Sequence, residues 1–250
     1  MNKIITLIMD VSEQMLTNGA EVGRVEESLR RMGLAYGAAR VDAFIITSNM
    51  QVSVFTSDGN TYTQTRRVTD LTTNIEKLHR LNALVRKICK DAPSPELIET
   101  ELQKISQIKS YPIPLAIFCY GIISGAFAVF FGGGVADALC ALCVGLFTGI
   151  LVKLAEKGNL NRIFSRFFCS FAATLLAFGA AKLGLAPTAE YIIIGTIMTL
   201  IPGVGLTVAL RDLFSGDSIS GLLRTVEALL LTLAIVGGYF LSTAILGGAV

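Results

Sequence analysis

Tryptophan is absent from this chain of 250 residues, and histidine occurs once, at His79. The first 111 residues contain no glycine-rich phosphate loop, no Ser/His/Asp set and no cluster of metal-binding residues, and no ATP-binding motif occurs in the chain. His79 lies in a polar helical stretch, so we interpret it as a surface residue rather than a ligand or general base. These absences argue against an enzyme, and we expect neither a metal nor a cofactor.

Charge is scarce after Pro112. Of the 21 lysine and arginine residues, 14 precede Pro112, as do 13 of the 19 acidic residues, which leaves seven basic and six acidic side chains for the rest of the chain. That second part consists of long apolar stretches separated by short polar loops. We therefore predict a cytoplasmic α+β domain at 1–111 and a membrane α-helical bundle at 112–250. The net charge of +2 argues against nucleic-acid binding.

Five cysteines occur, and four of them lie in apolar segments. Cys140 and Cys143 form a C-x-x-C pattern that would suit redox or metal chemistry. No second pair and no histidine accompanies them. The same spacing places both thiols on one face of a membrane helix, and this is the interpretation that we favour.

Hydrophobic periodicity predicts four helices and three strands in the first 111 residues. Apolar side chains recur at helical spacing from Ile4 onward, and Asn18-Gly19 ends that helix. From Val41 the period changes to two, and Asp58-Gly59 is the signal of a hairpin turn. The predicted helices cover 4–17, 71–89 and 95–108, a further one begins at Val22 and ends at Gly33 or Gly37, and the predicted strands begin at 41, 51 and 61.

A charged constellation lies at the start of the second predicted helix. One interpretation is a corner that binds a small molecule or a partner. The other is a helix cap with a solvated charged face, on which two glutamates pair with arginines four residues later. The constellation comprises Asn18-Gly-Ala-Glu21, Arg24, Glu26 and Glu27, and the expected pairs are Glu26–Arg30 and Glu27–Arg31.

Five apolar segments after Tyr111 are each long enough to cross about 30 Å of hydrocarbon. Small residues in the first segment favour close packing between helices, namely Gly121, Ser124, Gly125 and Ala128. The predicted spans are 112–131, 135–154, 164–183, 191–210 and 222–241.

Basic residues in alternate loops predict the orientation of these spans. Four lie between the second and third spans, and Arg211 and Arg224 lie between the fourth and fifth, whereas the first loop has none and the third has only Lys182. The N-terminus is therefore expected in the cytoplasm and Val250 outside, in a bacterial inner (cell) membrane. Acidic residues interrupt the first apolar stretch early, so no secretory signal peptide is expected.

An odd number of spans without a recognisable internal repeat is unusual for a self-contained transporter. We therefore expect this chain to work with a small membrane partner subunit, with further copies of itself, or with both.

The fourth predicted span contains Pro202-Gly203. Proline removes a backbone donor, and the carbonyls that it frees need a cavity or neighbouring protein. The segment is therefore either a substrate site of the kind that broken helices form, or a packed proline kink. Polar and small residues follow it at Arg211, Asp212, Asp217, Gly221, Arg224 and Glu227.

Glu227 is expected more than one turn inside the fifth span, where a carboxylate needs a partner or a proton. It is a candidate proton carrier, with Arg224 as its counter-ion or as the group that grips a substrate carboxylate. The alternative is an interfacial ion pair whose side chains reach water. Asp137, at the outer start of the second span, has the same two interpretations: a functional carboxylate or an interfacial group that reaches water.

The run Leu200-Ile-Pro-Gly-Val-Gly-Leu, with Arg211-Asp212-Leu-Phe-Ser-Gly-Asp and Ser220-Gly221-Leu-Leu-Arg224, resembles the signature of the threonine/serine exporter family. The segment from Asn18 to Gly33 resembles the opening of that family's soluble domain, so the likeness spans essentially the whole chain. The matching residues are Pro202, Gly203, Asp212, Gly221 and Arg224 in the membrane signature and Glu21 and Glu26 in the soluble one, whereas Arg211 and Glu227 are not matched.

The resemblance implies the layout of the larger subunit of a two-component exporter, which works with a separate small membrane protein. It implies export of a succinate-like dicarboxylate, as in the two-component form, or of threonine and serine, as in the single-chain form. Because no ATP-binding motif is present, an ion gradient is expected to drive transport. The alternative from another class is a ligand-sensing or scaffold subunit whose soluble domain binds a partner or metabolite.

Overall fold

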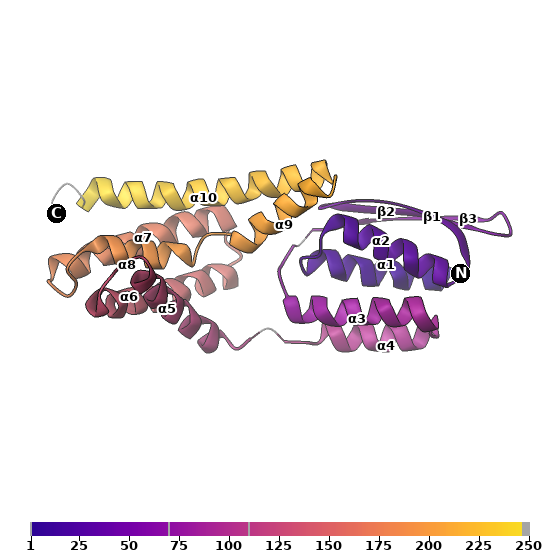
Figure 1. Ribbon diagram of the computed structural model, residues 1–250, viewed down its shortest axis with the longest axis horizontal. Coiled ribbons are helices and arrows are strands. Elements are labelled where there is room, and N and C mark those ends of the chain that lie inside the picture. The colour runs from indigo at the N-terminus through magenta and orange to yellow at the C-terminus, as the bar shows by residue number, and fades with distance from the viewer. Residues whose placement is uncertain (1, 70, 110, 247–250) are drawn as a thin grey trace. The chain divides into compact units, whose positions relative to one another are not determined.

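The computed structural model describes residues 2–69, 71–109 and 111–246, and it divides into two compact units (Figure 1). Unit 1 comprises Met1–Ser110 and Val204–Thr225, and unit 2 comprises Tyr111–Gly203 and Val226–Val250. Unit 1 thus includes a segment from the later part of the chain. The predicted domain boundary after residue 111 stays a prediction, as does the side on which Val250 lies, because that residue is outside the described ones.

Unit 1 begins with helices and strands close to those that the periodicity predicted. They are α1 (Asn2–Thr17), α2 (Val22–Ala35), β1 (Ala38–Ile46), β2 (Asn49–Thr56), β3 (Thr61–Arg67), α3 (Ile75–Asp91) and α4 (Pro95–Ser106). The strands form an antiparallel sheet in the order β1-β2-β3. The third helix begins at Ile75 rather than at Leu71, because the Asn74 side chain accepts a hydrogen bond from the Lys77 N–H and caps the helix there.

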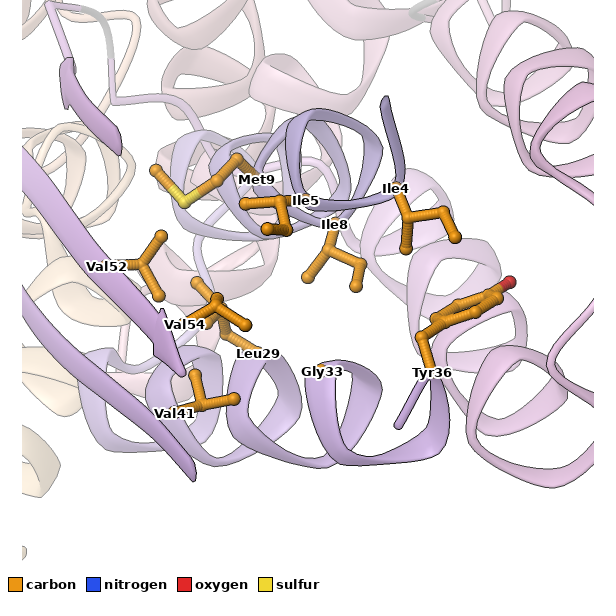
Figure 2. A pocket seen from close by; sticks show the side chains of 10 residues that line it. All are labelled: Ile4, Ile5, Ile8, Met9, Leu29, Gly33, Tyr36, Val41, Val52 and Val54. Atoms are coloured by element: carbon orange, nitrogen blue, oxygen red, sulfur yellow. The ribbon is translucent and has the colours of Figure 1, made fainter. Parts of the chain in front are cut away.

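The hydrophobic core of unit 1 includes α1, α2 and the sheet, and Met9, Met15 and Leu29 are at most 1% exposed in it. Gly33 lets α2 approach the sheet, since a Cβ there would lie 2.6 Å from Val41 Cγ2. Figure 2 shows the gap that remains between ten lining residues of these elements. Its volume of about 10 Å³ holds at most one water and its walls are almost entirely apolar, so we interpret it as a packing defect.

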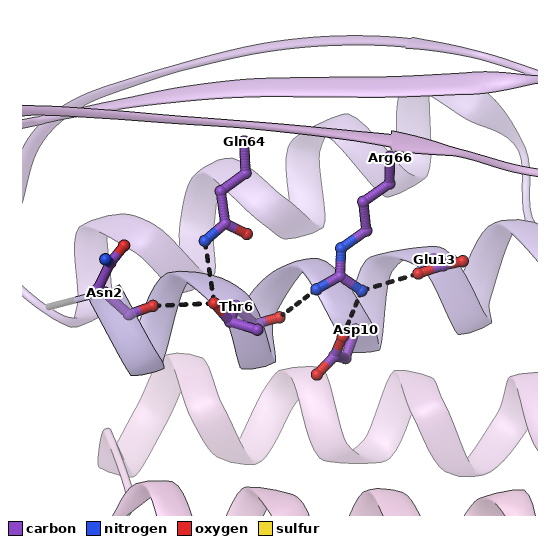
Figure 3. A network of polar contacts seen from close by, with 6 residues as sticks. All are labelled: Asn2, Thr6, Asp10, Glu13, Gln64 and Arg66. Carbon is purple, nitrogen blue, oxygen red and sulfur yellow. Dashed lines mark hydrogen bonds and ion pairs between the residues drawn. The ribbon is translucent and has the colours of Figure 1, made fainter.

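A polar network ties β3 to α1 (Figure 3). The Arg66 guanidinium contacts the Asp10 carboxylate and donates to Glu13 Oε2 at 2.8 Å and to the Thr6 carbonyl at 3.3 Å. Gln64 adds a hydrogen bond to Thr6 Oγ1 at 2.9 Å. The edge strand is thereby held by a half-buried arginine that meets two carboxylates, in addition to the ladder with β2.

The rest of the chain is helical in its described part. The helices are α5 (Ile113–Phe130), α6 (Val135–Lys157), α7 (Arg162–Lys182), α8 (Ala189–Met198), α9 (Gly203–Phe214) and α10 (Ser218–Leu246). Four of them, α5, α6, α7 and α10, are long and apolar enough to cross a membrane, and a fifth span results if the bent pair α8 and α9 is counted as one. The predicted fourth span therefore corresponds to a broken pair, and the protein is a helical membrane protein with four or five candidate spans.

Close backbone approach characterises unit 2. A Cβ on Gly145 of α6 would lie 2.4 Å from Ser124 Oγ, and one on Gly195 of α8 would lie 2.5 Å from the Ser124 carbonyl oxygen. Both helices therefore pack on α5 at a distance that only glycine permits, as small-residue interfaces in membranes do. The prediction from the sequence is confirmed, because the buried residues of α5 are Gly121, Ser124, Gly125 and Ala128.

Candidate functional site

The helical hairpin of α9 and the start of α10 belongs to unit 1 and is closed by Gly216, whose φ of +95° suits glycine. The Asp217 N–H donates to the Asp212 carbonyl at 2.9 Å across this turn. Gly221, one turn into α10, lies so close to α9 that a Cβ would come within 2.7 Å of the Leu213 backbone nitrogen. Two glycines thus fix the geometry of the hairpin.

Asp212 is fully buried at the contact of this hairpin with α2. Its Oδ1 accepts a hydrogen bond from the Val22 N–H at 3.2 Å. Val22 is the first residue of α2, where backbone N–H groups lack partners inside the helix and carry partial positive charge. The carboxylate of Asp212 therefore supplies the acceptor that the N-terminus of α2 needs.

Arg224 of α10 compensates the charge of Asp212. Its Nε lies 3.4 Å from Asp212 Oδ2, and Nη2 donates to the Ala20 carbonyl at 3.3 Å. Neither Nε nor Oδ2 has a hydrogen-bond partner among the described residues, so this contact is an ion pair without a close hydrogen bond. With an exposed fraction of 11% for the Arg224 side chain, the pair is largely shielded from water.

Glu21 and Arg211 form a second, more exposed pair beside the first, with Oε1 and Nη1 2.8 Å apart. Arg211 is 64% exposed, so this pair contributes little to stability. Glu21 occupies the N-cap position of α2, but its side chain does not cap the helix. The charged corner that the sequence left with two interpretations thus contacts the hairpin of the same chain.

Glu26 differs from the sequence expectation. Its Oε1 accepts a hydrogen bond from the Ile45 N–H of β1 at 2.8 Å, so the expected pair with Arg30 is wrong. Burial raises the pKa of Glu26, the Ile45 N–H opposes that rise, and the nearby Asp217 carboxylate adds to it. Asp217 comes this close because Gly23 has no side chain, since a Cβ there would lie 2.8 Å from Asp217 Oδ2.

Glu27 forms ion pairs with both Arg30 and Arg31 on the outer face of α2. It contacts Arg31 at 2.6 Å and Arg30 at 2.9 Å. The expected Glu27–Arg31 pair is confirmed, and Arg24 lies exposed on the same helix.

The remaining residues that the sequence singled out lie apart from this cluster. Pro202 lies between α8 and α9, Gly203 is the first residue of α9, and both belong to unit 2. Glu227 lies 3.8 Å from Arg162 Nη1 at the start of α7, and both side chains are more than half exposed. Arg224 thus pairs with Asp212 rather than with Glu227.

Four further residues that the sequence singled out have simple structural explanations. Asp137 is 2% exposed and accepts a hydrogen bond from the Gly134 N–H at 2.9 Å, which caps α6. His79 is exposed on α3, as predicted. Cys140 and Cys143 are free thiols on α6, and the described residues contain no group of three or more His, Cys, Asp or Glu that suits a metal ion.

Sequence reasoning missed the backbone groups of the site, the Ala20 carbonyl and the Val22 N–H. No local signal reveals them, because Val22 and Asp212 are 190 positions apart. The assembled cluster places an arginine and an aspartate, both largely buried, at a helix N-terminus. An anionic group that competes with Asp212 for Arg224 would change the contact between the hairpin and α2.

A family model described as "Putative threonine/serine exporter" matches residues 6–246. The chain is 29% identical to the "Threonine/serine exporter" of Corynebacterium glutamicum over 94% of this chain and 50% of that protein. It is 26% identical to the "Probable succinate transporter subunit YjjP" of Escherichia coli, over 93% of this chain and 91% of that protein. The "Probable threonine/serine exporter" of Mycobacterium tuberculosis is 26% identical, over 96% of this chain and 46% of its own length. The chain thus spans about half the length of the two exporters, and no solved structure matches it.

Proposed function

Because the chain belongs to the threonine/serine exporter family, we propose that it is one subunit of a secondary-active exporter in a bacterial inner membrane. Its cargo is a small carboxylate-bearing metabolite, either a succinate-like dicarboxylate or threonine and serine. The chain matches nearly the whole of a relative that is named a succinate transporter subunit. This match supports a dicarboxylate as the cargo and the presence of a separate partner subunit. The likeness to two proteins named threonine/serine exporters supports the amino acids.

The proposed topology has five crossings with the N-terminus in the cytoplasm. If α5, α6 and α7 each cross, the chain leaves α7 on the side opposite to its first 110 residues. The hairpin at Val204–Thr225 belongs to the same compact unit as those residues, which supports a return between α7 and α10. In this topology the chain crosses the membrane for the fourth time through the apolar α8 and the break after it. The basic residues of the loops support the cytoplasm as that side.

The Asp212–Arg224 contact is the observation that carries the proposed mechanism. Its closest atoms are 3.4 Å apart, whereas a carboxylate that meets the guanidinium fork side-on makes two parallel hydrogen bonds. A substrate carboxylate therefore competes with Asp212 for Arg224. Once Arg224 turns to the substrate, its bond to the Ala20 carbonyl is lost as well, and the hairpin separates from α2. Substrate binding is thereby linked to movement of α10.

Efflux from cells that carry or lack the gene, together with a co-expressed small membrane partner, tests the exporter function. Labelled succinate, threonine and serine are loaded, and their release is followed over time. The same measurement in liposomes, with this chain and its partner as the only proteins, separates an exporter from a ligand-sensing or scaffold subunit. Unchanged efflux of all three compounds would contradict the proposal.

Arg224→Lys tests the site. A lysine keeps the charge but cannot make two parallel hydrogen bonds. The rate of transport per correctly folded protein should therefore fall, by an amount that corresponds to a rise of roughly 1.5–3 kcal/mol in the apparent activation free energy. Arg162→Lys, in the exposed pair with Glu227, is the matched control and should transport normally. Wild-type flux in Arg224→Lys would remove this residue from the substrate path.

A further inference from the structure

The buried face of α7 begins with an arginine. The buried residues of this helix recur at helical spacing and comprise Cys169, Ser170, Ala173, Thr174, Ala177 and Phe178. Arg166 lies three and four residues before the first two of them, so it extends the same face by one turn. Its Nη1 atom is buried and has no hydrogen-bond partner among the described residues, while the residue as a whole is half-buried. Arg166 thus directs an unused donor into the bundle and stays reachable from water.

Arg166 lies close to the break between α8 and α9. Cys169 belongs to one cluster of buried side chains with Ile235 of α10 and with Leu200, which lies at the break. The Ser170 hydroxyl donates to the Ile235 carbonyl at 2.8 Å and holds α10 against the same face of α7. Arg166 lies about 5 Å closer to the start of α7 than these contacts. In the proposed topology this is the cytoplasmic side, from which an exporter takes up its cargo.

The charge of Arg166 has no carboxylate partner in the described part of unit 2. Two carboxylates lie at the same end of the bundle, and each contacts another basic residue. Glu156 contacts Lys153 at 2.7 Å, and Glu227 lies 3.8 Å from Arg162 Nη1. An ionisable side chain within a membrane helix is costly and is by default a candidate functional group. The unpaired donor and the uncompensated positive charge together favour an anionic ligand.

From this arrangement we propose that Arg166 binds a carboxylate of the transported cargo inside unit 2. A carboxylate supplies the acceptor that Nη1 lacks, and the planar guanidinium can hold both carboxylate oxygens by parallel hydrogen bonds. Succinate, threonine and serine all carry this group, so Arg166 serves either class of cargo. The proposal rests on the exporter function and adds a second binding position to it, since Arg224 belongs to unit 1 and Arg166 to unit 2.

Chemical modification of arginine tests the site in the unaltered protein. The full-length chain and its partner subunit are treated in a nonionic detergent with phenylglyoxal, which modifies guanidinium groups, and mass spectrometry follows each arginine. At equal ionic strength, succinate, or threonine and serine, should slow the modification of Arg166 about fivefold. Arg162, one turn earlier and 62% exposed, should react at an unchanged rate. Succinamide and threoninamide, in which a neutral amide replaces the carboxylate, should not protect Arg166.

Several outcomes of this experiment would overturn the proposal. The absence of protection at Arg166 is one, and equal protection by the amides is another, because no carboxylate contact is then involved. Protection of Arg224 alone would support the mechanism proposed for that residue and remove Arg166 from the path. Protection by added phosphatidylglycerol, but by none of the carboxylates, would assign Arg166 to a lipid phosphate.

Arg166→Met separates binding from structure. The substitution removes an unpartnered buried donor and keeps an apolar stem, so the variant should unfold at the wild-type temperature or above it. It should nevertheless bind labelled cargo about tenfold more weakly, as expected for the loss of a charged hydrogen bond. Arg162→Met, in the exposed pair with Glu227, is the matched control and should keep the wild-type affinity. Wild-type affinity in Arg166→Met, whatever its stability, would overturn the proposal.

Both readouts are independent of flux. Protection of Arg166 in a chain that fails the efflux assay would show that the chain binds a carboxylate without exporting it. Efflux without protection of Arg166 would leave the exporter function intact and overturn only this binding position. If Arg166→Met folds poorly, the protection measured in the unaltered protein decides.

Discussion

Asp212 and Arg224 form a largely buried ion pair in which Oδ2 and Nε are 3.4 Å apart, at the point where the α9–α10 hairpin meets the first turn of α2. Each also contacts the backbone at the start of α2, through the Val22 N–H and the Ala20 carbonyl. A buried pair of this kind is sensitive to the loss of either member, because the remaining charge has no compensation.

Asp212→Asn should therefore destabilise the protein by about 3 kcal/mol. The asparagine oxygen still accepts the hydrogen bond from Val22, so the loss reports the unpaired guanidinium of Arg224 rather than a missing cap. Chemical or thermal unfolding of the purified full chain in detergent measures the change. If stability is unaffected, water reaches Arg224 and the pair is not shielded.

A double-mutant cycle isolates the interaction of Asp212 with Arg224. Arg224→Met removes the charge and keeps much of the apolar stem, so the double variant with Asp212→Asn should be more stable than the sum of the two single effects predicts, by at least 1 kcal/mol. The exposed pair of Glu21 with Arg211 serves as the comparison and should show coupling below about 1 kcal/mol.

Gly221→Ala should open the hairpin. Its added methyl group would lie 2.7 Å from the Leu213 backbone nitrogen, so α9 and α10 must separate, at a loss of roughly 1–3 kcal/mol. Gly203→Ala is the matched control, since no atom lies within 4 Å of a Cβ at that position. Thermal unfolding of both variants checks this difference. Loss of transport in a stable Gly203→Ala protein would point to a functional need for that glycine.

Glu26 should make stability depend on pH in a direction opposite to that of a salt-bridged carboxylate. Because its pKa is raised in the folded protein, its favourable contribution is present below the ordinary glutamate pKa of 4.5 and is lost as the pH rises through the raised pKa. Glu26→Gln keeps an acceptor for the Ile45 N–H and cannot ionise, so it should be at least as stable as the wild type at pH 7.

The neighbouring carboxylate provides a check on this assignment. Asp217 raises the pKa of Glu26, so Asp217→Asn should reduce the stability that is lost as the pH rises and narrow the pH range over which this loss occurs. Melting temperatures measured between pH 4 and pH 8 for the three proteins distinguish the cases. An identical pH profile for the wild type and Glu26→Gln would show that Glu26 titrates as a solvated side chain.

The packing of α8 on α5 should depend on Gly195. Its replacement by alanine would place a methyl group 2.5 Å from the Ser124 carbonyl and 2.9 Å from the Ala128 nitrogen, both backbone atoms that cannot rotate away. We expect a loss of about 1–3 kcal/mol. Gly179→Ala on α7 has open space around the new methyl group and should unfold like the wild type. Unfolding in detergent compares the two.

The elements of unit 1 were predictable because their signals are local. Periodicity and the Asp58-Gly59 turn involve neighbours in sequence, as do the small residues on α5 in unit 2, and the structure contains them close to the expected positions. The largest shift concerns the start of α3, where the capping side chain of Asn74 defines the first turn.

The contacts of the candidate site were not predictable, because they join residues about 200 positions apart. The sequence marked Glu21, Asp212 and Arg224 separately, and only the fold brings them to one point. Glu26 illustrates the same limit, since spacing along the helix favoured Arg30 whereas the neighbouring strand offered an unpaired N–H at Ile45. A buried backbone donor outweighs an exposed ion pair, and its position is not encoded in helical periodicity.

The short length of α8 has a consequence for biogenesis. A segment of about 15 Å is too short to partition into the bilayer by itself as a complete span. Its residues Ile192, Gly195 and Thr196 are buried against neighbouring helices, which include α5. We therefore expect α5, α6 and α7 to be inserted before α8 packs against them, so that the bundle assembles in the order in which the chain is translated.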